Sequence, residues 1–167
     1  GQTLIGNKWV FKKKKNGIYR ARLVALGYSQ VPGVDFTENY APVVNDITMR
    51  ILLVLKMVHK WSGEIIDVET AFLYGELEDE IYMTIPKGLS EYSNGEDLSM
   101  ECVMLKKSIY GLVQAARAWW KKFTKSLQDI GFKRCPSDNC LMMRKNAAGV
   151  VILCIHVDDV CCIRDKT

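Results

Sequence analysis

Two apolar runs rich in β-branched residues constrain the fold of this chain more than any other part of its sequence. They cover residues 150–157 and 160–163, and Asp158 and Asp159 lie between them. Short runs of this composition that meet at turn-forming residues are typical of paired strands. We therefore predict a tight hairpin with two carboxylates at its tip.

A second hairpin is predicted near the N-terminal end. Residues 9–13 alternate apolar and polar side chains, residues 18–25 form another strand-like run, and Asn16-Gly17 lies between the two. Asn-Gly favours a type I′ turn, because both central residues of that turn need a positive φ. In the second strand Arg20 and Arg22 share one face, and lysines occupy the tip, so the predicted ribbon is basic.

The remaining elements mix helices and strands. Residues 115–130 predict one helix, and short strands are expected at 64–68, 81–85 and 103–105. Another helix is expected over residues 47–60. Its positions with core spacing are Ile47, Ile51, Leu55 and Val58. Because strands and helices do not alternate regularly, the predicted fold class is α+β.

Charge is distributed unevenly along the 167 residues. Residues 1–34 carry seven basic and no acidic side chains, whereas residues 64–97 carry ten acidic side chains and one lysine. A basic arm and an acidic segment fit a protein that handles polyanions and holds carboxylates for cations. The distribution of charge alone is equally consistent with an alternative, in which the charged side chains simply cover solvated helix faces and loops.

The composition excludes several classes of protein. With 49% apolar and 25% charged residues, the chain is neither collagen-like nor wholly disordered. No apolar run approaches the roughly 20 residues of a membrane-spanning helix, and no secretory signal is visible. The six cysteines form no C-x-x-C pair, so we expect reduced thiols and an intracellular protein.

Three aspartates indicate metal chemistry. Asp67 closes the short apolar strand at 64–68, and Asp158 and Asp159 lie in the C-terminal hairpin. Hard divalent cations prefer oxygen ligands, and a pair of magnesium ions bridging a phosphoryl group is held by carboxylates of this kind. Asp-Asp is also favourable in turns, which is the alternative when these residues are considered alone.

Longer strings of residues carry a specific resemblance. The strings are Ala21-Arg22-Leu23-Val24-Ala25, Gly27-Tyr28-Ser29-Gln30, Ala41-Pro42-Val43-Val44, Asp67-Val68-Glu69-Thr70-Ala71-Phe72-Leu73-Tyr74-Gly75, Leu105-Lys106-Lys107-Ser108-Ile109-Tyr110-Gly111-Leu112, Gln114-Ala115 with Arg117-Ala118-Trp119, and Val157-Asp158-Asp159. In this order, and over nearly the whole chain, they resemble the reverse transcriptase of copia-type LTR retrotransposons.

The resemblance implies an α+β fold made of the fingers and palm of a right-hand polymerase, with a ferredoxin-like palm and without the thumb. Residues 1–167 would form one reverse transcriptase region, with 1–45 mainly the fingers hairpin and 46–167 mainly the palm, ending just after the catalytic hairpin. The implied reaction transfers a dNTP onto a primer 3′-hydroxyl along an RNA or DNA template. Two Mg²⁺ ions, or Mn²⁺ as a substitute, are the implied cofactors.

The residues of the site follow from the same resemblance. The implied catalytic residues are Asp67, Asp158 and Asp159, and these three together with Val68, through its carbonyl, are the implied metal ligands. The implied dNTP-binding residues are Arg20, Arg22, Thr70, Ala71, Phe72, Tyr110, Gly111 and Gln114. Phe72 would lie beneath the sugar, and the amides of Thr70 and Ala71 would meet the triphosphate. The implied nucleic-acid-binding residues are Lys13, Lys14, Lys15, His156 and Val157.

One departure from the family pattern affects the primer side of the site. His156 stands where the family usually has tyrosine before Val-Asp-Asp. An inactive or domesticated retroelement fragment that only binds nucleic acid is therefore the alternative function, and a purely structural fragment is a third.

The resemblance also implies partners and a location. The expected partners are a template with its primer, a dNTP, and the rest of a Pol polyprotein, including integrase and RNase H, which this chain lacks. No membrane partner is expected. The expected location is cytoplasmic retrotransposon particles or the nucleus, and the sequence leaves the oligomeric state open.

Overall fold

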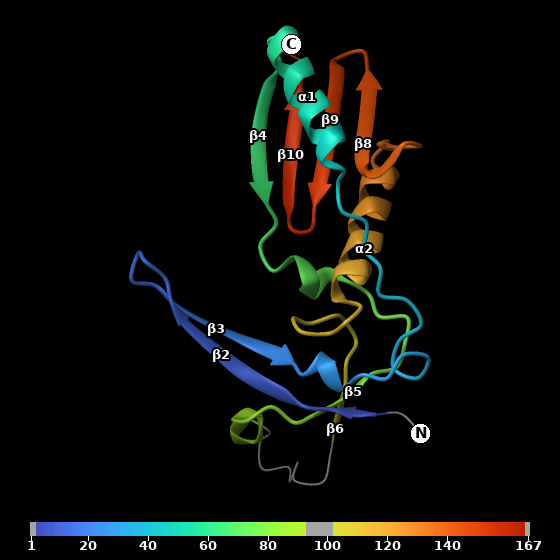
Figure 1. The fold of residues 1–167 in the computed structure, drawn as a ribbon. Helices are drawn as coiled ribbons and strands as arrows, with labels where there is room; N and C mark the ends of the chain where they lie inside the picture. The colour runs from blue at the N-terminus through green and yellow to red at the C-terminus, as the bar shows by residue number, and fades with distance from the viewer. Residues whose placement is uncertain (1–2, 93–101, 166–167) are drawn as a thin grey trace. The chain divides into compact units, whose positions relative to one another are not determined.

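The structure is a computed structural model that describes residues 3–92 and 102–165 (Figure 1). The chain divides into two compact units. Unit 1 consists of Gly1–Tyr40 and Phe72–Trp119, and unit 2 consists of Ala41–Ala71 and Trp120–Thr167. Residues 72–119 pack with the N-terminal segment in unit 1. The mixture of helices and strands confirms the α+β class.

Unit 2 is built on a five-stranded antiparallel sheet. Its strands in spatial order are β4 (Ser62–Asp67), β10 (Asp159–Arg164), β9 (Gly149–His156), β8 (Asp138–Asn146) and β7 (Lys133–Cys135). β4 is therefore an edge strand. In Figure 1 the end of β4 and the turn between β9 and β10 lie at the same end of the sheet.

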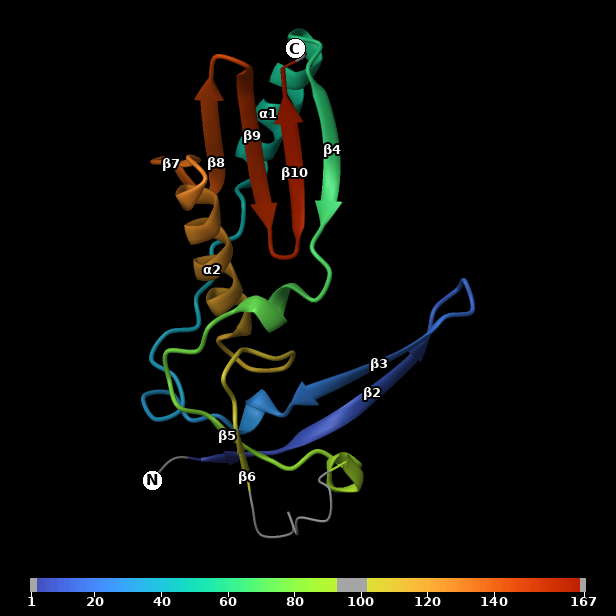
Figure 2. The same cartoon turned by 180° about the vertical axis from the view of Figure 1, so that it is seen from behind.

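Two helices pack on opposite faces of this sheet, as a comparison of Figure 1 with its reverse view in Figure 2 shows. Along β9 alternate side chains point to opposite faces. Ile152 and Cys154 pack with Leu52 of α1 (Asp46–Val58), whereas Leu153 and Ile155 pack with Leu127 of α2 (Ala115–Asp129). Within the described part of the chain, no helix has the length and apolar character needed to cross a membrane.

The ends of both helices have local causes. The side chain of Asn45 accepts a hydrogen bond of 2.8 Å from the N–H of Ile47 and caps the N-terminus of α1. Gly131 has a φ of 90° just after α2, a conformation that glycine adopts at low cost. The observed α2 confirms the helix predicted over residues 115–130.

The predicted core face of α1 is wrong. Ile47, Ile51 and Val58 are 66%, 55% and 68% exposed, and Leu52 is the residue buried against the sheet. The physical reason is that α1 is apolar on nearly every side, so helical spacing fits several stripes equally well. The sheet contacts only one of these stripes.

Unit 1 contains a small sheet and a two-stranded ribbon. The sheet joins β1 (Leu4–Ile5), β5 (Tyr82–Thr84) and β6 (Cys102–Met104), with β1 parallel to β5, and the ribbon pairs β2 (Asn7–Lys13) with β3 (Tyr19–Ala25). Short 3₁₀ turns cover Gly27–Ser29, Ala71–Tyr74 and Leu89–Tyr92. The core of unit 1 consists of Ile5, Ala25, Ile81, Met83, Leu112 and Ala115.

The turn of the ribbon is not the predicted type I′ turn. The N–H of Gly17 donates a 2.9 Å hydrogen bond to the carbonyl of Lys14, and Gly17 has a φ of 84°, whereas Asn16 has no positive φ. This geometry is a type I turn followed by a left-handed glycine, a common three-residue hairpin loop. Asn-Gly therefore predicted the hairpin correctly but placed the turn one residue too late.

The turn of the C-terminal hairpin is also shifted. Val157 and Asp158 form the two-residue turn, and Asp159 is already the first residue of β10, opposite His156. Only one of the two carboxylates lies at the tip. The second occupies a strand position, where its side chain has a defined face and a neighbour on each adjoining strand.

Cysteine reactivity offers a direct check of the burial in this fold. Cys102 is exposed, whereas Cys140 and Cys154 are buried, and burial raises the pKa of Cys140 to about 11 and that of Cys154 to about 12. Because the thiolate is the reactive form, a thiol reagent at about pH 8, near the ordinary thiol pKa, should modify Cys102 first. Mass spectrometry of the labelled chain should find Cys140 and Cys154 unmodified until denaturant is added, and rapid labelling of either in the folded chain would contradict this core.

Candidate active site

Carboxylates from two neighbouring strands of unit 2 face each other. Asp67, the last residue of β4, is paired in register with Asp159, the first residue of β10. Side chains directly opposite on antiparallel strands have Cβ atoms about 4.5–5.5 Å apart and share a face. His156, opposite Asp159 on the other side, lies on the same face. The sheet thus brings Asp67 and Asp159 together from positions far apart in the sequence.

A backbone contact holds Asp158 next to these carboxylates. The N–H of Val68 donates a 3.0 Å hydrogen bond to the carbonyl of Asp158, so the chain leaving β4 is tied to the β9–β10 turn. Val157, the first turn residue, has a φ of 59°. A β-branched side chain is strained in this left-handed region, and a positive φ at this position is typical of a type II′ hairpin turn.

The electrostatics of this edge favour a cation. Asp67, Asp158 and Asp159 are exposed, and among residues 3–92 and 102–165 no side chain forms an ion pair or hydrogen bond with their carboxylates. Like charges on directly opposite positions destabilise a strand pair. The oxygen donors therefore fit a hard divalent cation, although no three acidic, His or Cys side chains of the described residues lie close enough to hold one ion together.

Thr70 and Ala71 follow this edge along the chain. Thr70 has a φ of 54° in the turn after β4, and Ala71 is buried at the start of a 3₁₀ turn. Successive N–H groups in such a turn can bind anions. Their predicted contact with a triphosphate stays a prediction.

In unit 1, three of the predicted nucleotide-binding residues come together. The guanidinium carbon of Arg22 lies 5.0 Å from the centre of the Tyr110 ring, and the ring of Phe72 lies 5.2 Å from that of Tyr110 at an interplanar angle of 58°. A guanidinium over a tyrosine face is a favourable cation–π contact. The Nε of Arg22 is buried without a hydrogen-bond partner among the described residues.

A close approach of two glycines positions Tyr110. The N–H of Ala25, at the end of β3, donates a 2.8 Å hydrogen bond to the carbonyl of Tyr110. A Cβ on Gly111, which has a φ of 92°, would lie 2.1 Å from the carbonyl oxygen of Ala25, and a Cβ on Gly27 would lie 2.1 Å from the carbonyl oxygen of Gly111. Only glycines let these two segments meet, and their meeting brings Arg22 over Tyr110.

The ribbon carries its arginines on one face. Arg20 pairs with Lys12 and Arg22 pairs with Val10, so these residues share a face. Lys13 lies on the opposite face, with its ammonium 5.2 Å from the centre of the Tyr19 ring. Lys14 and Lys15 are exposed in the turn. The arginines predicted to bind the dNTP thus share one face, whereas the lysines predicted to bind nucleic acid lie on the opposite face and at the tip.

Gln114 lies in a buried polar network that sequence reasoning missed. Its Nε2 donates to the carbonyl of Asp35 at 3.2 Å, and its Oε1 accepts from Nε2 of Gln30 at 3.0 Å. Gln30 in turn accepts from the N–H of Val113 at 2.9 Å. The amide of Gln114 is therefore used within unit 1. Paired glutamines 84 residues apart in sequence carry no local signal that would have predicted this contact.

Asp35 anchors the same network, and its substitution should destabilise unit 1. Burial raises the pKa of Asp35, but hydrogen bonds from Val31 and Thr3 outweigh that effect and hold the pKa below its ordinary value. The resulting stabilisation is complete above the ordinary Asp pKa of about 4 and is lost as the pH falls below it. Asp35→Asn should lower the free energy of unfolding at neutral pH by about 2 kcal/mol, and urea unfolding would measure it. The exposed control Asp129→Asn should change it little, and equal losses would contradict the role of Asp35.

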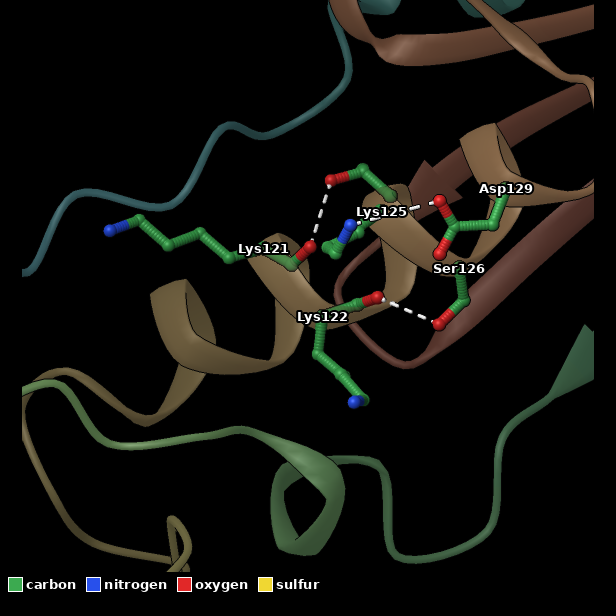
Figure 3. Close-up of polar contacts among 6 residues, drawn as sticks. Lys121, Lys122, Lys125, Ser126 and Asp129 are labelled. Atoms are coloured by element: carbon green, nitrogen blue, oxygen red, sulfur yellow. Dashed lines mark hydrogen bonds and ion pairs between the residues drawn. The ribbon is translucent and has the colours of Figure 1, made fainter.

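The lysines of α2 form a separate feature of unit 2. Figure 3 shows the side chains of Lys121 and Lys122 extending from the helix in different directions, while Lys125 lies 3.7 Å from Asp129 in an ion pair one helical turn away. Ser126 donates a 3.0 Å hydrogen bond to the carbonyl of Lys122. These contacts are internal to the helix and do not distinguish a solvated face from a surface that contacts phosphates.

These features together define a class of protein. The molecule is an α+β protein with carboxylates on adjoining strand ends and a basic ribbon, a combination typical of chemistry on phosphates. Residues 1–166 match the family described as reverse transcriptase (RNA-dependent DNA polymerase). The chain therefore belongs to the reverse transcriptase family, as the motifs predicted.

Curated relatives point to the same group. The chain is 37% identical over 163 residues to the retrovirus-related Pol polyprotein from transposon RE1 of Arabidopsis thaliana, with 95% of this chain and 11% of the relative covered. It is 39% identical over 173 residues to that from transposon TNT 1-94 of Nicotiana tabacum, covering 99% and 13%. The truncated transposon Ty1-A Gag-Pol polyprotein of Saccharomyces cerevisiae is 27% identical, covering 95% and 12%. No solved structure shows significant similarity to the chain.

Proposed function

We propose that this chain is the fingers and palm part of an RNA-directed DNA polymerase that transfers nucleotides to a primer 3′-hydroxyl. In this proposal β2 and β3 are the fingers ribbon, and the sheet of unit 2 is the palm. The single observation that carries it is the pairing of Asp67 with Asp159 in a chain of this family. The chain spans 11–13% of these plant relatives, so the rest of a Pol polyprotein, with its RNase H and integrase, is the proposed covalent partner.

The three carboxylates and the carbonyl of Val68 are the proposed ligands of Mg²⁺, with Mn²⁺ as a substitute. Bound divalent cations lower the pKa of an attacking hydroxyl and neutralise charge on a phosphoryl group. The protein contributes by fixing Asp67 and Asp159 on adjoining strands and by tying Asp158 to Val68 through the 3.0 Å backbone hydrogen bond. Preorganised donors cost no rearrangement when the reacting groups arrive.

The cluster of unit 1 is the proposed nucleotide platform. Guanidinium groups bind phosphate oxygens in a bidentate manner, and the unpartnered Nε of Arg22 leaves a donor for such an oxygen. The Phe72 and Tyr110 rings, 5.2 Å apart, offer an apolar surface for a sugar. A bulky ring at this position would clash with a 2′-hydroxyl and so favour dNTPs over NTPs.

Primer extension tests the proposal. The chain is incubated with an RNA template, a DNA primer, dNTPs and Mg²⁺, and compared with Asp158→Asn. We expect extension by the parent chain and none by the variant, because the variant loses a charge proposed to hold the cations. Asp129→Asn, a carboxylate on α2 outside the site, should extend as the parent does. Equal extension by the parent and Asp158→Asn would contradict the assignment.

A second candidate function is nucleic-acid binding without transfer. The observation that favours it is that no three of the described acidic, His or Cys side chains come together around one ion position. It predicts binding of RNA that weakens steeply with salt and no incorporation of dNTPs. Salt-dependent binding together with the absence of extension would therefore select this function.

A further inference from the structure

The outer side of α1 is an apolar surface that the rest of unit 2 leaves exposed. Ile47, Ile51, Val54 and Val58 recur at helical spacing and are all more than half exposed, and we call these four residues the α1 stripe. Met57 beside the stripe is also exposed. A helix of a globular protein normally turns its apolar face inward and its polar face outward.

Contact with the sheet does not account for these residues. Leu52 and Met49 are the α1 side chains that pack against the sheet, next to Ile152 and Ile163. Each aliphatic side chain that stays largely in water forgoes the free energy that its burial would release. Contiguous apolar surface of this kind commonly marks a site of association.

The charges at the two ends of α1 indicate which partner fits. Asp46 lies in the first turn, and Lys60 follows the helix, whereas the side chain of Lys56 in the last turn lies over Gly63 on the sheet side. A second copy of α1 laid antiparallel on the first would bring each Asp46 next to the Lys60 end of its partner. A parallel arrangement would instead oppose like charges at both ends, and like helix dipoles would also meet.

The spacing of the residues in the α1 stripe is the same from either end of the helix. In the antiparallel arrangement Ile47 faces Val58 of the second copy, and Ile51 faces Val54, so apolar side chains meet along the whole helix. A surface that is complementary to itself in this way is the requirement for a two-fold symmetric dimer. The aliphatic stem of Arg50, on the same side of the helix, can lie along the partner while its head stays in water.

We propose that the α1 stripe is the surface through which two copies of this chain associate, with their α1 helices antiparallel. The proposal does not depend on the polymerase function, because none of the stripe residues belongs to the proposed site. In this proposal the surface that forms the dimer lies entirely in unit 2.

Sedimentation equilibrium of the whole chain over a wide concentration range tests the proposal. The parent chain should be in monomer–dimer equilibrium, and Val54→Glu should weaken association by roughly 30-fold or more, as expected for a charge in the centre of a buried interface. Phe11→Glu, which places the same charge on an even more exposed apolar residue of unit 1, should leave the equilibrium unchanged. Circular dichroism of each variant checks that α1 still forms.

Charge exchange tests the antiparallel arrangement separately. Asp46→Lys and Lys60→Glu should each weaken the dimer, and the double variant should recover most of the parent affinity, because the opposite charges meet again. A parent chain that stays monomeric at every concentration would overturn the proposal. Association that ignores Val54→Glu, or that the double variant fails to recover, would overturn it as well.

Discussion

Gly111→Ala should lower the free energy of unfolding by about 3 kcal/mol or more, or prevent unit 1 from folding. Two costs combine at this position. The backbone of Gly111 is left-handed, with a φ of 92°, and a Cβ would lie 2.1 Å from the carbonyl oxygen of Ala25. The obstructing atom is backbone at the end of β3, which cannot move without breaking the hydrogen bond between Ala25 and Tyr110. Urea unfolding of the variant measures the effect.

Two matched variants separate these costs. Gly17→Ala introduces the left-handed strain alone, because the φ of Gly17 is 84° and no atom lies within 4 Å of the added Cβ. It should lower the free energy of unfolding by about 1 kcal/mol. Gly27→Ala introduces the steric clash alone, because the added Cβ would lie 2.1 Å from the carbonyl oxygen of Gly111 and the φ of Gly27 is not positive. The expected order of loss is Gly111, then Gly27, then Gly17. A loss at Gly111 no larger than that at Gly17 would contradict the close approach.

Asp67→Asn should abolish primer extension, with a decrease of about 1,000-fold or more in rate, because it removes a charge proposed to hold the cations. The same substitution should raise the free energy of unfolding without metal by up to about 1 kcal/mol, because Asp67 and Asp159 repel each other across β4 and β10. Mg²⁺ should raise the thermal midpoint of the parent chain, as any ligand of the native state does, and should raise that of the variant much less.

Glu64→Gln is the control for this prediction. Glu64 lies on the same strand, three residues before Asp67, and its carboxylate is 3.9 Å from Arg164. Its neutralisation removes a weak surface ion pair and should leave extension and the Mg²⁺ effect unchanged. A Mg²⁺ shift that persists in Asp67→Asn would place the cation elsewhere, and a loss of stability in that variant would show that the two carboxylates do not repel each other.

Local patterns predicted the elements that local forces determine. The apolar runs around Asp158 gave two strands, the Asn-Gly pair gave the β2–β3 hairpin, and the spacing of residues 115–130 gave α2. The predicted turns of both hairpins were wrong by one residue. Different types of hairpin loop accept the same kinds of residue and differ only in the φ of one or two loop positions. Strand β8 was missed, since its residues mix polar and apolar side chains around Cys140.

Long-range contacts were beyond what the sequence alone could predict. The assembly of residues 72–119 with the N-terminal segment depends on the fit of Gly27 against Gly111, which no local pattern encodes. In the site, the motif pointed to Asp67, Asp158 and Asp159, yet the pairing of Asp67 with Asp159 follows from the register of β4 and β10. The outward face of α1 was unpredictable because its hydrophobicity is nearly uniform around the helix.

The left-handed φ of Val157 lowers the stability of the folded chain, so selection for stability alone and selection for activity should favour different residues at this position. Strain of this kind costs on the order of 1–3 kcal/mol, and glycine or asparagine would adopt the same backbone with less strain. A laboratory selection for heat resistance that ignores activity should therefore collect Gly or Asn at position 157, next to Asp158. Continued recovery of valine under such a selection would mean that its side chain stabilises the folded chain by more than the backbone strain costs.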